Sequence, residues 1–368
     1  MPSETPAPSG TRAPRRFGGS PLVWPLLALA GLLLYNLVVT PAFFALRVQD
    51  GHLYGSLVDV LRNGAPTALI ALAMTLVIAT RGIDLSVGAS VAISGAVACT
   101  WIAGSPDPTA AGTAVVAIAL ALGLCLVLGV FNGMLVAGLG IQPIIATLVL
   151  MTAGRGLAQL VTNGQIVTVS NPFFSAVGGG FLLGLPIPVL LTAAAFVVVA
   201  LVTRRTALGL LVESVGVNPT ASRLVGIRSR GIVWGAYVLT AVCAGLAGLM
   251  LSSTVNAADA NNAGLWIELD AILAVVIGGT LLTGGRYSIV GTLVGALVLQ
   301  TLTTTVYTTG IRPEITLVFK ALVIIAVCLL QSPKLRRTRR PPAAAPPASS
   351  PTPREPTATA APTPASTR

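Results

Sequence analysis

Charged residues are scarce in this chain: only 9% of its 368 residues are Asp, Glu, Lys or Arg, whereas 54% are hydrophobic. Soluble domains carry about 25% charged residues, so a soluble core cannot absorb this much apolar surface. The apolar runs are each about as long as the ~20 residues that a membrane-spanning helix needs. The ~10-residue alternating segments of a membrane β-barrel are absent. The composition therefore predicts an all-α, polytopic membrane protein.

Histidine and cysteine are also rare. The single histidine, His52, follows an apolar run, and one histidine cannot form a multi-histidine metal site. The four cysteines fall within apolar runs and no pair has metal-ligand spacing; they are Cys99, Cys125, Cys243 and Cys328. We therefore expect no metal site on this chain.

Ten apolar segments are candidates for membrane-spanning helices. They cover about 22–46, 61–80, 85–104, 112–137, 143–162, 182–203, 231–253, 268–282, 288–309 and 314–332. The Pro-, Ser- and Arg-rich segment 1–20 is typical of a disordered tail. Residues 333–368 begin with a basic run and continue Pro- and Ala-rich, which predicts a second disordered tail. The membrane domain is therefore expected to span 21–332.

The distribution of lysine and arginine predicts how these segments are oriented. With ten spans and both ends inside, 17 of the 22 basic residues fall on the cytoplasmic side and 3 outside, while Arg155 and Lys320 lie within spans. Such asymmetry is the positive-inside pattern of membrane proteins. It accounts for the net charge of +11 without a nucleic-acid partner. We predict that both termini are cytoplasmic.

The longest cytoplasmic loop, residues 204–230, reads RRTALGLLVESVGVNPTASRLVGIRSR. Its apolar residues recur at helical spacing on either side of GVNPT. Gly216 is expected to end one helix, Asn218 to cap the next, and Pro219 to lie in the first turn of that helix. The sequence therefore predicts a short helix–turn–helix at the inner membrane face. Two interpretations are open: an interfacial helix resting on lipid, and a docking helix for a soluble partner that supplies force.

The stretch VESVGVNPTASRLVGI resembles the cytoplasmic coupling loop of ATP-binding-cassette (ABC) importer permeases of the ribose/simple-sugar class. Three further stretches agree in order: RGIDLSVGASVAISGAVA with the GGIDLSVG signature, GIQPIIATLVLMTAGRGLAQLVTNGQ, and the C-terminal block from ELDAILAVVIGG onward. The resemblance covers about 60–332 and looks closest to the galactofuranose-type permeases. One departure is Thr80-Arg81, where many relatives have small residues; the simplest interpretation of Arg81 is a cytoplasmic anchor.

The resemblance implies a function and a set of partners. The chain would be the permease subunit of an importer that moves a monosaccharide from an extracytoplasmic sugar-binding protein into the cytoplasm of a bacterium. A second permease subunit, identical or paralogous, and a separate ATPase that holds ATP and magnesium would complete it. The residues implied in the coupling loop are Glu213, Gly216, Asn218, Ala221, Arg223 and Gly226; those in the signature turn are Gly82, Asp84, Ser86 and Gly88.

The chain itself has no nucleotide-binding motif. The closest run, GTLLTGGR at 279–286, has P-loop glycine spacing but lacks the lysine and the hydroxyl residue that contact phosphate and magnesium. We therefore expect no cofactor on this chain. The turn around the signature is explained locally: Gly82 allows a tight reversal, and Asp84 or Ser86 can cap the helix that follows.

Polar residues within or at the ends of the apolar spans are candidates for a sugar pathway, because amides offer both donors and acceptors. The candidates are Asn132, Gln142, Arg155, Asn163, Gln165, Asp270 and Gln300. For Arg155, pairing with a carboxylate such as Asp270 competes with snorkelling to the membrane surface. The same amides can instead bond neighbouring helices.

The sequence disfavours two other classes of function. An ion-coupled secondary transporter of a small polar solute usually has an acid or histidine buried in mid-span. Here every carboxylate maps near a membrane edge or in a loop or tail. A membrane enzyme would need catalytic groups clustered at one membrane face, and the sequence shows no such cluster.

Overall fold

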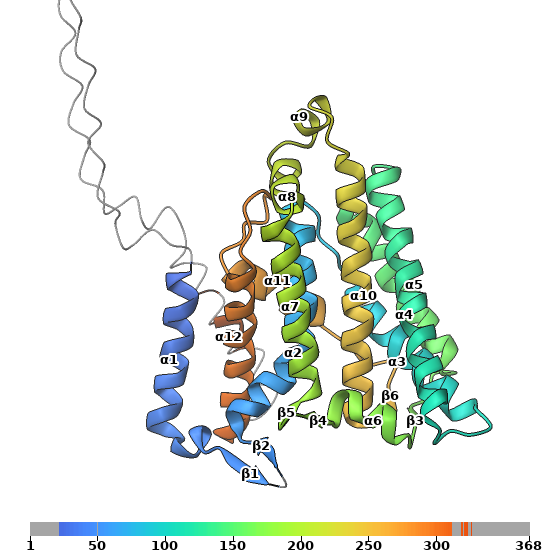
Figure 1. Cartoon of the computed structure of the whole chain (residues 1–368), viewed down its shortest axis with the longest axis vertical. Coiled ribbons are helices and arrows are strands. Elements are labelled where there is room, and N and C mark those ends of the chain that lie inside the picture. Colours follow the sequence, from blue (N-terminus) through green and yellow to red (C-terminus); the bar gives the residue numbers. More distant parts are fainter. Residues whose placement is uncertain (1–21, 50, 311–317, 319, 323–324, 326–368) are drawn as a thin grey trace, which may run out of the picture. The chain divides into compact units, whose positions relative to one another are not determined.

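The computed structural model describes residues 22–49, 51–310, 318, 320–322 and 325. These all fall within one unit, Met1–Gln331 (Figure 1). Among them, seven helical segments are long and apolar enough to cross a membrane. They are α2 (Ser56–Ala79), α3 (Val87–Gly104), α4 with its π-helical end (Ala111–Gly138), α5 (Pro143–Val161), α7 (Ile187–Arg205), α10 (Ser229–Val255) and α12 (Ile289–Thr308).

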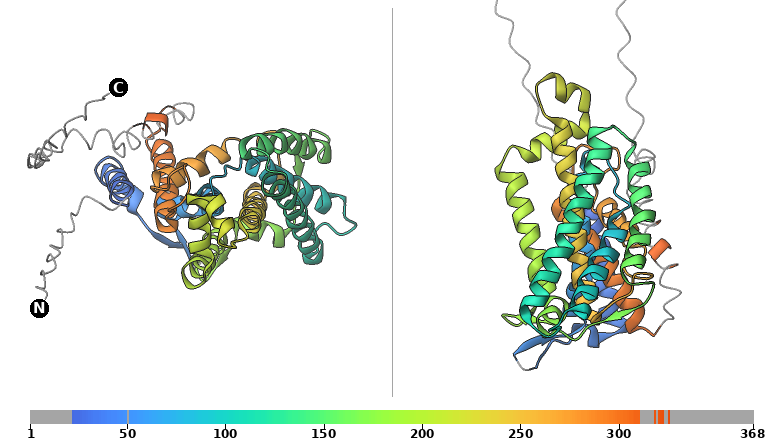
Figure 2. Two further views of the ribbon diagram at one scale, coloured as in Figure 1. Left: turned by 90° about the horizontal axis from the view of Figure 1, so that it is seen from above. Right: turned by 90° about the vertical axis from the view of Figure 1, so that its right-hand side faces the viewer.

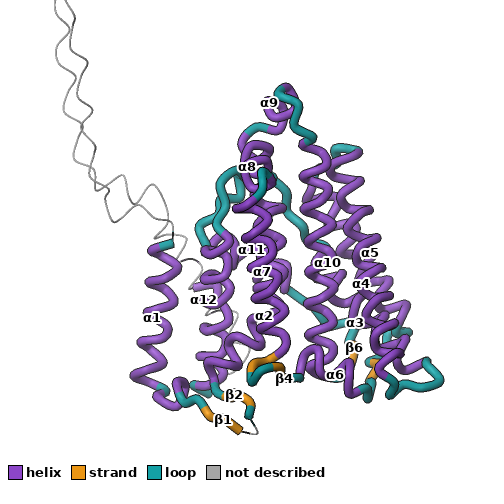
Figure 3. Tube along the Cα trace, in the orientation of Figure 1, coloured by secondary structure: helices purple, strands orange, loops and turns teal. Residues whose placement is uncertain are grey.

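Shorter helices complete the described part of the chain. They are α1 (Val23–Val39), the 3-10 turn Pro41–Phe44, α6 (Pro172–Gly179), α8 (Leu208–Val217), α9 (Pro219–Leu224) and α11 (Ile267–Ile277). Helices dominate the trace, and strands occur only as short segments between them (Figure 3). A helical membrane protein is what the composition predicts.

Several predicted spans need correction. The predicted span 22–46 is shorter as a helix, because Pro41 starts a separate 3-10 turn and a strand follows. The predicted span 268–282 corresponds to α11 (Ile267–Ile277), whose eleven residues are fewer than the ~20 that a helix needs to cross a bilayer by itself. The span 182–203 begins five residues later, after a small hairpin. Of the span 314–332, only residues 318, 320–322 and 325 are described, and these are helical.

The two ends of the helical unit differ. At one end lie α8 and α9; at the other lie α6 and three two-stranded ladders (Figure 1). The ladders pair β1 (Arg47–Gln49) with β2 (His52–Tyr54), β3 (Val167–Thr168) with β6 (Ala257–Ala258), and β4 (Phe181–Leu182) with β5 (Leu185–Pro186), all antiparallel. Since the basic loop 204–230 belongs to the α8–α9 end, we call this the inner end and the opposite one the outer end.

Close contact between α3 and α10 forms the centre of the bundle. A Cβ added at Gly95 would lie 2.0 Å from the Ser252 hydroxyl, and one at Gly248 would lie 2.1 Å from the Ser94 hydroxyl. Small residues at helix interfaces let backbones approach closely, which strengthens packing where lipid removes the hydrophobic drive. Seen from the inner end, α1 and α12 lie on the side opposite to α4 and α5 (Figure 2). Helix α5 is therefore at the edge of the described bundle.

Candidate coupling site and polar face

Helices α8 and α9 form the helix–turn–helix that the sequence predicts. The Asn218 side chain accepts hydrogen bonds from the backbone N–H groups of Thr220 and Ala221, at 3.1 and 3.0 Å. Pro219 begins α9, where its missing N–H costs nothing. After α9 the chain turns at Gly226, whose φ is +87°. The predicted cap and break are thus confirmed, and α9 lies at the tip of the inner end (Figure 1).

Gly216 has a different role from the predicted one. It lies inside α8, which continues to Val217, so it does not end the helix. A Cβ added at Gly216 would lie 1.9 Å from the Ala79 carbonyl oxygen and 2.5 Å from the Gly285 nitrogen. Glycine is therefore needed here for close approach of three backbone segments.

The signature turn begins with a left-handed residue that is not glycine. The N–H of Gly82 donates to the Val77 carbonyl and that of Arg81 to the Ile78 carbonyl, both at 2.9 Å, as in a Schellman motif. Arg81 holds the left-handed position with φ of +68°. Gly82 does not supply the reversal, which corrects the prediction. Its hydrogen makes room for Tyr237, because a Cβ there would lie 2.5 Å from the Tyr237 hydroxyl.

Three segments meet at this turn, and we call their contact the inner joint: residues 79–82, residues 216–217 and residues 284–285. The Arg81 guanidinium donates a hydrogen bond to the Val217 carbonyl at the end of α8. The Gly285 N–H donates to the Ala79 carbonyl at 2.8 Å. A cation at a helix C-terminus also interacts favourably with the helix dipole. The inner joint therefore ties α8 to the end of α2 and to the turn before α12.

A buried polar group follows the inner joint. Asp84 is 1% exposed and accepts hydrogen bonds from the Ser86 N–H and hydroxyl, at 3.0 and 2.6 Å. The Asn132 amide donates to the Ser86 hydroxyl at 2.8 Å, which joins α4 to the signature turn. Neither Asp84 nor Ser86 caps α3 through its side chain. The second carboxylate oxygen of Asp84 (Oδ2) and the amide oxygen of Asn132 (Oδ1) have no hydrogen-bond partner among the described residues.

Gly88, the last residue of the predicted signature set, provides another close approach. A Cβ there would lie 2.4 Å from a Glu268 carboxylate oxygen and 2.7 Å from the Gly264 carbonyl. The start of α11 therefore packs against the start of α3, deep within the bundle. The signature glycines thus serve packing and the polar members serve a hydrogen-bonded cluster.

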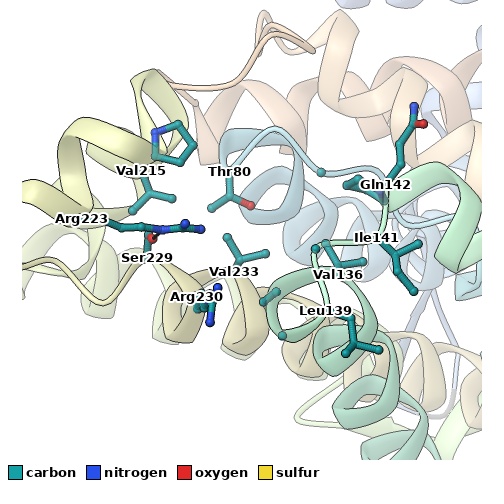
Figure 4. A pocket seen from close by; sticks show the side chains of 16 residues that line it. Thr80, Val136, Leu139, Ile141, Gln142, Val215, Arg223, Ser229, Arg230 and Val233 are labelled. Carbon is teal, nitrogen blue, oxygen red and sulfur yellow. Dashed lines mark hydrogen bonds between the residues drawn. The ribbon is translucent and has the colours of Figure 1, made fainter.

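A cavity of about 350 Å³ lies beside the coupling helices (Figure 4). It is bounded by the coupling helices, the start of α10 and the turn between α4 and α5; labelled lining residues include Thr80, Val136, Gln142, Val215, Arg223 and Arg230. The Arg223 guanidinium donates to the Ser229 hydroxyl at 2.9 Å, which links α9 to α10. Of the predicted coupling residues, Arg223 lines this cavity, and Glu213 lines a second cavity with Arg204 and Tyr287. Burial raises the pKa of Tyr287 above its ordinary value.

A polar group lies toward the outer end of α5. Arg155 donates to the carbonyls of Asn261 and Ala263, at 3.3 and 3.1 Å, and Gln159 donates to the Asn261 side-chain oxygen at 2.9 Å. We call Arg155, Gln159 and Asn261 the polar face. The loop that carries Asn261 is held by Asp259, whose pKa is lowered by hydrogen bonds from Asn262 and the Asn261 N–H.

The remaining pathway candidates are not brought together. Asp270 forms an ion pair with Lys320 at 2.8 Å, so the suggested pair of Asp270 with Arg155 does not form. Asn163 and Gln165 are exposed in the turn after α5, with Asn163 left-handed at φ of +52°. Gln300 is half-buried on α12, where its Cβ packs on Gly64 of α2. That any of these residues contacts a sugar remains a prediction.

Sequence reasoning missed the contact between Arg81 and Val217, and also Gln159 and Asn261. No sequence signal marks the first, because a left-handed arginine cannot be recognised from residue types. The second had a signal: Arg155 and Gln159 are four residues apart, which places them on one face of a helix.

The comparison with protein families identifies the class. Residues 56–328 match the family described as branched-chain amino acid transport system / permease component. This match covers most of the chain, and the chain belongs to this family of membrane transport permeases. It is a multi-pass protein of the bacterial inner membrane.

Three individual proteins are similar to this chain over most of their length. The chain is 47% identical to the galactofuranose transporter permease protein YtfT of Escherichia coli (strain K12) over 88% of this chain and 94% of that protein. It is 37% identical to the fructose import permease protein FruF of Bifidobacterium longum (strain NCC 2705), over 89% and 92%. It is 36% identical to the ribose import permease protein RbsC of Escherichia coli (strain K12), over 84% and 93%. No solved structure matches.

Proposed function

We propose that this chain is the membrane subunit of an ABC importer that carries a monosaccharide into the cytoplasm. Ten spans with both termini cytoplasmic complete its topology. A separate ATPase subunit with ATP and magnesium, an extracytoplasmic sugar-binding protein and a second permease subunit complete the importer. Galactofuranose is the first sugar to test, because the relative with 47% identity carries that name; ribose and fructose follow.

The observation that carries this proposal is the inner joint. An importer driven by an external ATPase needs a protrusion that receives force and a stiff path from it into the membrane. The α8–α9 hairpin stands at the inner end. Its Gly216 lies against the backbone of Ala79 and Gly285, and its Val217 carbonyl accepts a hydrogen bond from the Arg81 guanidinium. Backbone contacts of this kind resist compression, because packed interiors transmit strain. The docking interpretation of loop 204–230 is therefore favoured over a helix that rests on lipid.

The sugar pathway is proposed to follow the polar face. Thr152, Arg155 and Gln159 lie at helical spacing on α5, and Thr152 and Gln159 are exposed. A polar stripe of this kind is costly against lipid, so it faces a water-filled path or another subunit. Amide and guanidinium donors there match the hydroxyl oxygens of a sugar.

Reconstitution tests the proposal. The chain is placed in liposomes with the ATPase and binding protein encoded beside it, and uptake of labelled galactofuranose, ribose and fructose is followed. We expect uptake only with ATP inside the vesicle and binding protein outside. Uptake that continues without ATP and collapses when the proton gradient is removed would establish the ion-coupled alternative instead. A catalytically dead ATPase serves as the matched control.

A further inference from the structure

An apolar groove runs between α7 and α10 near the inner end. It has a volume of about 490 Å³ and is lined by Leu76, Val198, Val199, Val202, Thr203, Leu208, Val212, Arg228, Gly231, Ile232, Gly235, Ala236 and Leu239. Leu76 of α2 forms the floor of the groove, and Leu208 and Val212 of α8 close the inner end of the groove. We call it the inner groove.

The inner groove faces the surface of the bundle. Val198 and Val202 of α7 are 57% and 39% exposed. Helices α7 and α10 both pack on α2 and on α8, which holds them apart at this level. In a membrane, an apolar surface at this position is covered by lipid chains, because they are the solvent there.

Two glycines on α10 deepen the inner groove. No heavy atom lies within 4 Å of a Cβ added at Gly231 or Gly235, in contrast to Gly248 on the same helix, which packs on α3. Glycine inside a helix costs about 1 kcal/mol relative to alanine. Within the described residues no helix packs against these two glycines, so the space beside them is open to a further group.

Arg228 is the N-cap residue of α10, three residues before Gly231, and lines the groove with it. Its side chain makes no hydrogen bond or ion pair within the described part of the chain. The basic end of the groove thus offers a cation to an anionic group while the rest offers apolar side chains. A phospholipid has these two parts in this order.

We propose that the inner groove binds an anionic phospholipid of the cytoplasmic leaflet, with an acyl chain along Gly231 and Gly235 and the phosphate at Arg228. The site goes beyond the proposed function and depends on it only for the assignment of the inner end to the cytoplasm. A bound lipid would fill the space between α7 and α10 next to α8, so it would pack against the coupling helix α8 from the membrane side.

A second groove provides a natural comparison. It lies toward the outer end between α2, α7 and α12, measures about 320 Å³, and includes Leu61, Ala68, Val189, Phe196 and Leu293 in its lining. No charged residue lines it. We therefore expect lipid chains there without a preference for a headgroup.

A helix of a second permease copy is the competing occupant, since Gly231 and Gly235 have the G-x-x-x-G spacing of helix dimers. Lipid is favoured because an anionic headgroup complements the charge of Arg228, whereas an apolar helix offers no group to it. The experiment below separates the two occupants.

The test uses native mass spectrometry of the purified full chain, equilibrated with equal amounts of phosphatidylglycerol and phosphatidylcholine. The wild type is expected to retain phosphatidylglycerol in preference. Arg228→Gln should reduce that preference about fivefold, which is what one arginine near an anionic surface supplies. Gly235→Leu should displace the lipid. Gly123→Leu is the matched control, because a Cβ at Gly123 also meets open space and Gly123 lies outside the groove.

The outcomes decide the proposal. Loss of headgroup preference in Arg228→Gln, with lipid lost in Gly235→Leu and retained in Gly123→Leu, supports the lipid site. An unchanged preference in Arg228→Gln overturns it, and this variant alters only an exposed side chain, so folding does not obscure the result. A Gly235→Leu protein that keeps its lipid but no longer pairs with a second copy also overturns it and identifies a helix–helix contact.

Discussion

The inner joint and the polar face lie in opposite halves of the molecule and are built differently. In the inner joint, glycines bring backbone to backbone, and Gly216 leaves no room for a methyl group against Ala79. In the polar face, long side chains bridge α5 to a loop, and Gln159 is exposed. The first arrangement cannot adjust without moving whole helices. The second can exchange its partners one bond at a time.

This difference matches two tasks. A contact that transmits force must be stiff, whereas a contact that handles a passing sugar must release it. Backbone contacts at glycine cost little side-chain entropy, while ordering residues such as Arg and Gln costs up to about 2 kcal/mol each. The side chains of the polar face, like Arg81 in the inner joint, can therefore adopt other conformations, whereas the backbone contacts at Gly216 and Gly285 cannot.

The strongest test of the comparison is Gly216→Ala. The added methyl group would meet the Ala79 carbonyl oxygen, so α8 must shift. We expect a loss of stability of about 1–3 kcal/mol, as for overpacked cores, and loss of most uptake. Thermal unfolding and sugar uptake measure the two effects. The control Gly123→Ala adds the same methyl group in open space and should leave both unchanged or slightly raise stability. Equal behaviour of the two variants would contradict a stiff inner joint.

A smaller effect is expected for Arg81→Gly. Glycine adopts the left-handed conformation that Arg81 holds at φ of +68°, so the turn should form at least as well. The bond to the Val217 carbonyl is lost, which costs about 1 kcal/mol at an exposed site. We expect normal folding and more ATP hydrolysed for each sugar imported.

Arg205→Ala is the control for Arg81→Gly. Arg205 is an exposed arginine at the same end of the molecule, and its side chain has no bond to the described residues. It should keep the wild-type ratio of ATP to sugar. If Arg81→Gly keeps that ratio too, Arg81 is only a membrane anchor, as the sequence suggested.

The smallest effect is expected for Gln159→Leu in the polar face. The variant removes an exposed amide that is proposed to bond the passing sugar, and one such bond, worth about 1 kcal/mol, corresponds to roughly a fivefold rise in KM for uptake. The lost bond to Asn261 should lower stability by no more than about 1 kcal/mol, and basal ATP hydrolysis should stay the same. Gln142→Leu, which changes an exposed amide at the inner end of the same helix, is the control. A rise in KM for Gln142→Leu alone would move the pathway away from the polar face.

Patterns of apolar residues and local capping rules predicted much of this fold. They located the long helices within a few residues and identified Asn218 as a cap, because both depend on neighbours in sequence. They failed where distant segments meet. Gly216 has the residue type of a helix end, yet its position is set by Ala79 and Gly285. Helix α11 likewise packs mainly on α2 and α12, which are distant in sequence, and its own hydropathy does not mark its end.

The inner joint also bears on how the protein is made. The bond from Arg81 to Val217 joins residues 136 positions apart, and Gly285 is farther still along the chain. Chains emerge from the ribosome N-terminus first at about 5–20 residues per second. Helices α2 and α3 therefore enter the membrane many seconds before their partners in the inner joint exist. The signature turn therefore stays without its inner-joint partners until residues 217 and 285 have been synthesised.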